Sequence, residues 1–178
     1  MTTQELKQKI WAVLLKANGK EAINKCRNCS QANKNSMYED YNYNNKLVAV
    51  MLIERGWKVK PNEDIYAVDL VGTDPEGNEV AVECKIEFYP SNNFFFEVID
   101  DKGHHKDYWT DAKDKQVYFA GVCPKTKTLN LYDITEFRKL NNQNQKFGLV
   151  DSHYGTTGFL IGRTEPYAFK KARYELGI

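Results

Sequence analysis

Apolar residues recur along the chain with two different periods, which separate the predicted helices from the predicted strands. Between residues 4 and 17, and again from about Tyr38 to Arg55, apolar positions recur at helical spacing, and Gly56 is a typical helix end. Strand-like runs follow at 57–60, 65–72, 79–88, 94–99, 117–122, 128–132 and 158–162. Shorter helices are expected at 105–113, 134–140 and 167–176.

The order of these segments predicts the fold class. A helix, then a run of strands with a helix inserted, then mixed elements indicate an α/β or α+β core with a mixed sheet flanked by helices. The 178 residues are typical of a single domain. We expect the core at about 38–140, with the helix at 4–17 and the segment 141–178 as additions.

Composition and charge narrow the class of protein. No apolar run approaches the roughly 18 residues that a membrane span needs, and the N-terminal helix mixes Lys and Glu with apolar residues, unlike a signal peptide. We therefore expect a cytoplasmic protein with no membrane association. Although the net charge is only +1, basic residues are concentrated at 16–34 and 163–173. They would form a phosphate-binding rim if both stretches folded onto the active-site side of the protein.

Four cysteines are present, and two of them, Cys26 and Cys29, form a Cys-x-x-Cys pair. A structural zinc site usually needs a second closely spaced pair, whereas Cys84 and Cys123 are isolated in apolar runs. Reduced thiols are the simpler interpretation, and the role of Cys26 and Cys29 stays open.

Three polar residues on a predicted hairpin could carry chemistry. Glu83 and Lys85 share one face of the second strand, and the turn at 74–78 folds that strand back toward Asp69 on the first. Two opposed carboxylates repel each other, and a divalent cation relieves that repulsion. Oxygen ligands suit Mg²⁺, with Mn²⁺ as a substitute, and the backbone carbonyl of Cys84 could join them. Lys85 could then orient a water or stabilise charge on a phosphate.

The spacing from Asp69 to Glu83-Cys84-Lys85, behind a helix that ends at Gly56-Trp57, resembles the PD-(D/E)xK nuclease superfamily. Its members include restriction enzymes, Holliday-junction resolvases, homing endonucleases and repair nucleases. The resemblance covers about half of the chain and implies a restriction endonuclease-like core, formed by a helix, a strand, the catalytic hairpin, a helix and a further strand.

The same resemblance implies an activity and the residues that perform it. It implies a Mg²⁺-dependent endonuclease that hydrolyses DNA and acts as a homodimer or higher oligomer. Asp69 and Glu83 would bind metal and Lys85 would assist the water. The chain departs from the family at Val68, where many members have Pro, and near Asn45, where many members have a metal-associated Glu. Glu39 or Glu97 is the candidate that completes the metal shell.

Other interpretations stay open at this point. A cross-strand Asp-Glu-Lys group is commonly a surface ion-pair cluster, although Asp69 lies in an apolar run, where an unpaired carboxylate is costly. An RNA-directed nuclease and an inactive nucleic-acid-binding module on the same scaffold are the alternatives. The run His104-His105-Lys106 is either a phosphate-contacting loop or a solvated one.

Overall fold

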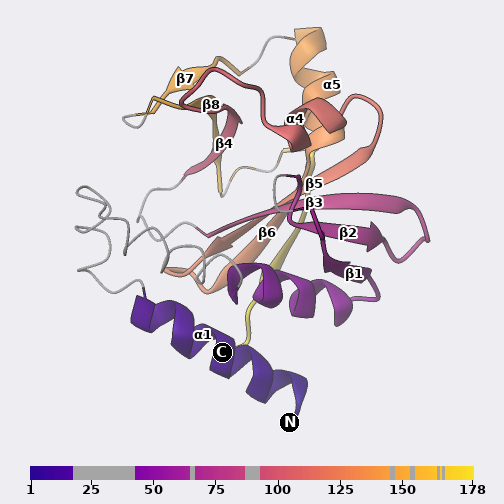
Figure 1. Ribbon diagram of the computed structural model, residues 1–178, viewed down its shortest axis with the longest axis vertical. Coiled ribbons are helices and arrows are strands. Elements are labelled where there is room, and N and C mark those ends of the chain that lie inside the picture. The colour runs from indigo at the N-terminus through magenta and orange to yellow at the C-terminus, as the bar shows by residue number, and fades with distance from the viewer. Residues whose placement is uncertain are drawn as a thin grey trace.

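The computed structural model describes residues 1–17, 43–64, 67–86, 93–144, 147–152, 155–163, 165 and 167–178. Among these residues the first helices are α1 (Thr3–Ala17) and a helix over residues 43–53 (Figure 1). Gly56 ends the second helix as predicted, because its φ of +86° is a conformation that glycine adopts without strain. The predicted helix start at Tyr38, the loop before it and the pair Cys26 and Cys29 lie outside the described residues.

Six strands form the central sheet, in the order β1-β2-β3-β5-β6-β9. Their bounds are β1 (Lys58–Pro61), β2 (Leu70–Thr73), β3 (Glu79–Ile86), β5 (Gln116–Cys123), β6 (Thr128–Asp133) and β9 (Lys170–Glu175). Neighbouring strands are antiparallel except for β3 and β5, which are parallel. The prediction of a mixed sheet flanked by helices is therefore confirmed.

The hairpin of β2 and β3 is closed by the predicted turn. The N–H of Asp74 donates to the carbonyl of Asn78 at 3.0 Å, and the Asp74 carboxylate accepts hydrogen bonds from the N–H and Nδ2 of Asn78 at 2.8 and 2.9 Å. Gly77 has a φ of +89°, which this turn requires. The turn fixes the register that pairs Leu70 with Val82.

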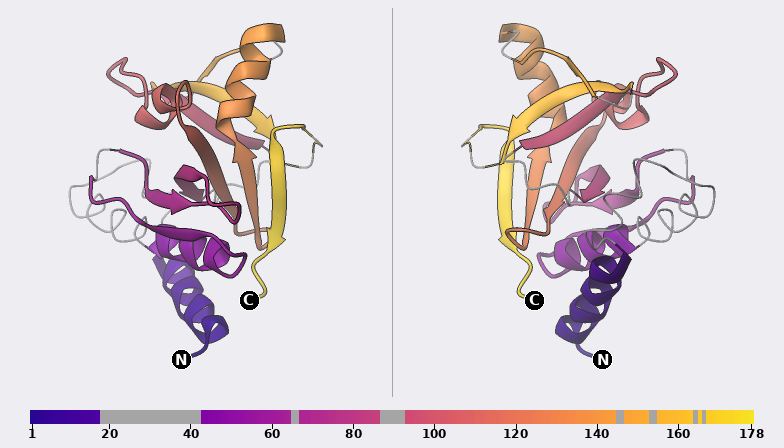
Figure 2. Two further views of the ribbon diagram at one scale, coloured as in Figure 1. Left: turned by 90° about the vertical axis from the view of Figure 1, so that its right-hand side faces the viewer. Right: turned by 90° about the vertical axis from the view of Figure 1, so that its left-hand side faces the viewer.

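A second layer covers the opposite face of the central sheet from α1 (Figures 1 and 2). It contains a three-stranded sheet in the order β4-β8-β7 and two helices. Their bounds are β4 (Asn93–Ile99), β7 (Val150–Asp151), β8 (Thr157–Gly162), α4 (Asp107–Asp111) and α5 (Ile134–Asn144). The two faces of β3 consequently lie in two cores: Val80 and Val82 pack toward α1, and Ala81 packs toward the second layer.

The structure corrects three sequence predictions. Residues 167–176 do not form a helix, because Lys170–Glu175 pairs with β6 as an edge strand with alternating burial. The strand predicted at 94–99 forms, but it lies in a second sheet where a single mixed sheet was expected, and its Phe94 and Phe96 bury their rings between the layers. The helix predicted at 134–140 continues to Asn144.

No helix in the described part of the chain has the length and apolar character needed to cross a bilayer.

Candidate active site

Asp69 lies immediately before β2, not inside the strand as predicted. The ladder between β2 and β3 ends at the pair Leu70 and Val82, and the next inter-strand hydrogen bond is made by a side chain. The Asp69 Oδ2 accepts it from the N–H of Cys84 at 2.8 Å, and Oδ1 accepts another from Asn45 Nδ2 at 2.8 Å. These two bonds hold the half-buried carboxylate between β3 and the helix over residues 43–53.

Glu83 lies on β3, one position beyond the last ladder pair, so the register places it opposite Asp69. Burial of its carboxyl group, together with the negative charge of Asp69, raises the pKa of Glu83 to about 8. Burial likewise raises the pKa of Asp69, against the two hydrogen bonds that lower it. The structure thus brings together the two acids that the sequence predicted to face each other.

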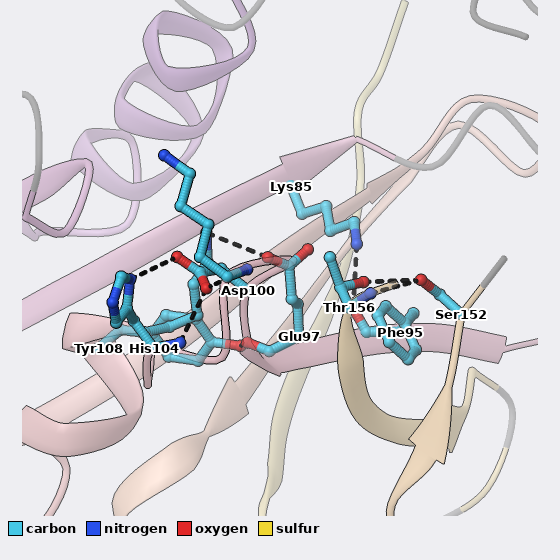
Figure 3. Close-up of polar contacts among 10 residues, drawn as sticks. Lys85, Phe95, Glu97, Asp100, His104, Tyr108, Ser152 and Thr156 are labelled. Atoms are coloured by element: carbon cyan, nitrogen blue, oxygen red, sulfur yellow. Dashed lines mark hydrogen bonds and ion pairs between the residues drawn. The ribbon is translucent and has the colours of Figure 1, made fainter. Parts of the chain in front are cut away.

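Lys85 shares the Glu83 face of β3, as its i+2 spacing predicts. Its Nζ donates to the main-chain carbonyl of Phe95 at 3.1 Å and lies 5.3 Å from the centroid of the Phe95 ring. Figure 3 shows Lys85 reaching from β3 to β4 in this way. The predicted lysine therefore stands on the side of the acid pair that faces the second layer.

Lys106 is a second cation at the site, which we expected only in a nucleic-acid-contacting loop. Its Nζ lies 3.2 Å from Glu97 Oε1, and its charge acts on both Glu83 and Asp69. Burial alone would lower the pKa of Lys106, but the carboxylates of Glu97 and Glu83 raise it. No spacing in the sequence marks this role, because Lys106 reaches the site through the fold of the loop before α4.

His104 and His105 form part of the turn that precedes Lys106. The Asp100 carboxylate closes this turn by accepting hydrogen bonds from the N–H groups of Lys102 and His104, at 2.9 and 2.8 Å (Figure 3). The His104 ring is exposed, with Nδ1 3.4 Å from Asp100 Oδ2. His105 is exposed as well and bridges to Ile99. Contact of either histidine with nucleic acid stays a prediction.

Further acids were expected to complete the metal shell. Glu97 lies close enough to Glu83 for its charge to raise the pKa of Glu83, whereas Glu39 lies outside the described residues. Within the described ranges, no group of three or more His, Cys, Asp or Glu side chains is arranged to hold a metal ion. Any metal site therefore needs other oxygen donors beside Asp69 and Glu83.

Asn45 offers such a donor. Its Oδ1 is buried and has no hydrogen-bond partner among the described residues, while its Nδ2 donates to Asp69. The carbonyl of Cys84 offers another donor. In a strand, the N–H and C=O groups of one residue point toward the same neighbouring strand, and the N–H of Cys84 points to Asp69. Two carboxylates, an amide oxygen and a carbonyl form a donor set that fits a hard cation such as Mg²⁺.

The described thiols do not contribute to this donor set. Cys84 and Cys123 are free and buried, and burial raises the pKa of the Cys84 thiol well above its usual range. Cys84 matters here through its backbone alone.

No protein-family model and no curated protein matches the sequence. Among solved structures, the chain is similar to Hjc, a Holliday junction resolvase from the archaeal hyperthermophile Archaeoglobus fulgidus. The identity is 13% and the TM-score 0.44, over 69% of this chain and 84% of that chain. A likeness of this size adds nothing about chemistry, so the function proposed below rests on the residues of this chain.

Proposed function

We propose that this chain is a metal-dependent endonuclease that hydrolyses phosphodiester bonds in DNA. The observation that carries the proposal is the opposed pair Asp69 and Glu83 at the open end of the β2–β3 hairpin, with Lys85 and Lys106 beside it. Opposed acids favour a cation, and neighbouring lysines favour an anion. A phosphate that approaches a bound cation satisfies both.

Asp69, Glu83 and the carbonyl of Cys84 would hold Mg²⁺ or Mn²⁺, with the amide oxygen of Asn45 or the carboxylate of Glu97 to complete the shell. When bound, the cation would polarise the scissile phosphate and lower the pKa of a water ligand. The raised pKa of Glu83 supports this assignment, because a bound cation would offset both the burial of its carboxyl group and the repulsion from Asp69.

Lys85 and Lys106 would act on the phosphate and on the water. Lys85 would hold the attacking water by a hydrogen bond and stabilise negative charge that develops on the phosphate oxygens. The bond from the water oxygen to phosphorus would form as the bond from phosphorus to the 3′ oxygen breaks, while the water loses a proton to solvent and the 3′ oxygen gains one from solvent. Lys106, held by Glu97, adds positive charge on the same side of the site.

A plasmid-nicking assay tests the proposal. Purified protein with Mg²⁺ should convert supercoiled plasmid to the nicked form, and EDTA should stop the reaction. Asp69→Asn, Glu83→Gln and Lys85→Ala should each lose about 100-fold or more in rate. Glu79→Gln, an exposed acid at the other end of β3, is the matched control and should cut like wild type. Absence of cutting by wild type, or full activity of all three variants, would overturn the proposal.

The two alternatives are distinguished in the same assay. Matched RNA substrates separate an RNA-directed nuclease from a DNA-directed one. An inactive binding module would bind DNA and leave the supercoiled plasmid uncut in the presence of Mg²⁺.

We also propose a homodimer or higher oligomer, because cutting both strands of a duplex needs two such sites. Sedimentation velocity should give a mass of at least twice 20.6 kDa, and a monomer throughout would contradict this part of the proposal.

A further inference from the structure

An irregularity in β9 places two basic side chains on one face of the central sheet. Arg173 pairs with Asn130, Lys170 pairs with Tyr132, and the register shifts between these pairs so that Lys171 is an extra residue. On a regular strand, residues three apart face opposite sides. The bulge removes that alternation and brings Lys170 and Arg173 to the same side.

This side is the one that carries the candidate active site. Residues paired across a sheet point to the same face, and two continuous rows cross from β3 to β9. One row joins Glu83, Phe119, Tyr132 and Lys170, and the other joins Lys85, Gly121, Asn130 and Arg173. With strands about 4.8 Å apart, three spacings put Lys170 and Arg173 roughly 14 Å from the acid and the lysine of the site.

Arg163 adds a third cation from the second layer. Its guanidinium lies 4.3 Å from the centroid of the Phe94 ring, and that ring covers Gly121 so closely that a Cβ there would meet it at 2.6 Å. Lys170 donates from Nζ to the main-chain carbonyl of Arg163. These contacts hold Arg163 above the rows that lead to β9.

Charge interactions show that the three cations converge. Burial is the main reason that the pKa of the Tyr132 hydroxyl is raised, and the positive charges of Arg163 and Arg173 act against it. Burial and the charge of Arg173 together lower the pKa of Lys170. The Tyr132 hydroxyl is buried here, and no hydrogen-bond partner for it lies in the part of the chain that the structure describes.

The neighbouring residue Lys171 shows the contrast. Its Nζ lies 2.5 Å from Glu136 Oε2 and 3.9 Å from Asp133 Oδ2, so its charge is compensated within the chain. Among the residues that the structure describes, no carboxylate lies within ion-pair distance of Lys170 or Arg173. Lys170 and Arg173 therefore differ from Lys171 in having no ion pair among the described residues.

We propose that Lys170 and Arg173, with the charge of the buried Arg163 behind them, form a phosphate-binding site for the backbone of the nucleic acid substrate. The cluster would bind the backbone away from the bond at Asp69 and Glu83, because buried residues such as Tyr132 and the second layer above them lie between the two sites. This inference rests on the proposed function for the identity of the substrate, although it concerns binding and not cleavage.

Salt-dependent binding tests the inference. A fluorescein-labelled DNA duplex of 20 base pairs is titrated with the full chain in EDTA, and fluorescence anisotropy is followed over a series of salt concentrations. Each phosphate contact contributes about 0.9 to the slope of log K against log salt. The double variant Lys170→Ala/Arg173→Ala should lose about 2 in this slope, whereas Lys171→Ala, one residue away, should keep the wild-type slope.

The inference fails if the double variant keeps the wild-type slope, if Lys171→Ala loses as much, or if wild type shows no salt-dependent binding. Arg173→Glu, at an exposed position, provides a second variant that should weaken binding further, and thermal melts of all variants check that they are folded.

Because no metal is present in the binding experiment, its result is independent of cleavage. If the double variant has a lower slope but wild type does not nick plasmid, the proposed function alone is refuted. If wild type nicks plasmid but the double variant keeps the wild-type slope, this inference alone is refuted. A matched RNA duplex shows which backbone the cluster prefers.

Discussion

The carboxyl group of Glu83 is buried beside that of Asp69, and this position sets how the site responds to pH. In the folded protein the pKa of Glu83 is about 8, above its ordinary value of 4.5, because burial and the neighbouring charge disfavour the ionised form. The folded state therefore holds a proton that the unfolded chain releases. Such a group stabilises the fold below the unfolded pKa, and that stabilisation disappears as the pH rises through the folded pKa.

We therefore predict that, in EDTA, the free energy of unfolding decreases between about pH 4.5 and pH 8 and that Glu83→Gln reduces this decrease. The amide stays neutral over the whole range, so it has no proton to lose. Urea denaturation at a series of pH values measures the effect, with Glu79→Gln as the control. Equal pH dependence in wild type and Glu83→Gln would show that Glu83 is already ionised in the folded protein.

Asn45 allows a second prediction at the scale of one residue. Its amide donates to Asp69, and Asn45→Asp would place a third carboxylate beside the acid pair. Without metal, repulsion should destabilise the protein by about 1–3 kcal/mol, since a buried hydrogen bond is replaced by an unfavourable charge. With Mg²⁺ or Mn²⁺, the added ligand should tighten binding, which isothermal titration calorimetry measures. Weaker metal binding by this variant would contradict the assignment of Asn45 as a metal ligand.

The position of β4 depends on a close contact between the two sheets. Gly121 on β5 leaves space for the Phe94 ring, and the next residue, Phe95, accepts the hydrogen bond from Lys85. Gly121→Ala should destabilise the protein by about 1–3 kcal/mol, because the ring has to move. Displacement of β4 should also lower the nicking rate. Gly148→Ala, where no atom lies within 4 Å of the added Cβ, is the control for thermal melts. Equal stability of both variants would show that β4 can shift freely.

Most elements near the site could be predicted from the sequence. The alternation of Val82 and Cys84 with Glu83 and Lys85 predicts the two faces of β3. The apolar residues pack in the core toward α1, and the polar residues lie in the candidate active site. The exact start of β2 could not be predicted, because the apolar run through Asp69 reads as strand while its carboxylate replaces the backbone pairing. Lys106 could not be identified either, since its approach to Glu97 depends on how the loop before α4 folds.

At the scale of the whole molecule, the sequence predicted the fold class but not the second sheet. Strands β4 and β8 pair across more than fifty residues, and nothing in either segment specifies its partner. Residues 167–176 have an apolar spacing that also suits a helix, and pairing with β6 decides in favour of a strand. The element order from the helix over residues 43–53 to β5 follows the order that the family resemblance implied, with β4 inserted before α4.

Metal binding should stabilise the entire fold, because the site joins the first helical layer through Asn45 to the second layer through Lys106. A ligand that binds the folded state alone adds about 2.7 kcal/mol at a concentration of 100 times Kd. We predict that the melting temperature rises with Mg²⁺ concentration in wild type. The double variant Asp69→Asn/Glu83→Gln should show no such rise, and an equal rise in both would place the cation elsewhere.

Anomalous diffraction from a crystal of the protein soaked in Mn²⁺ tests the central claim most directly. One peak is expected between the carboxylates of Asp69 and Glu83, within coordination distance of both. A peak elsewhere in the chain, or no peak at this pair under saturating Mn²⁺, would contradict it.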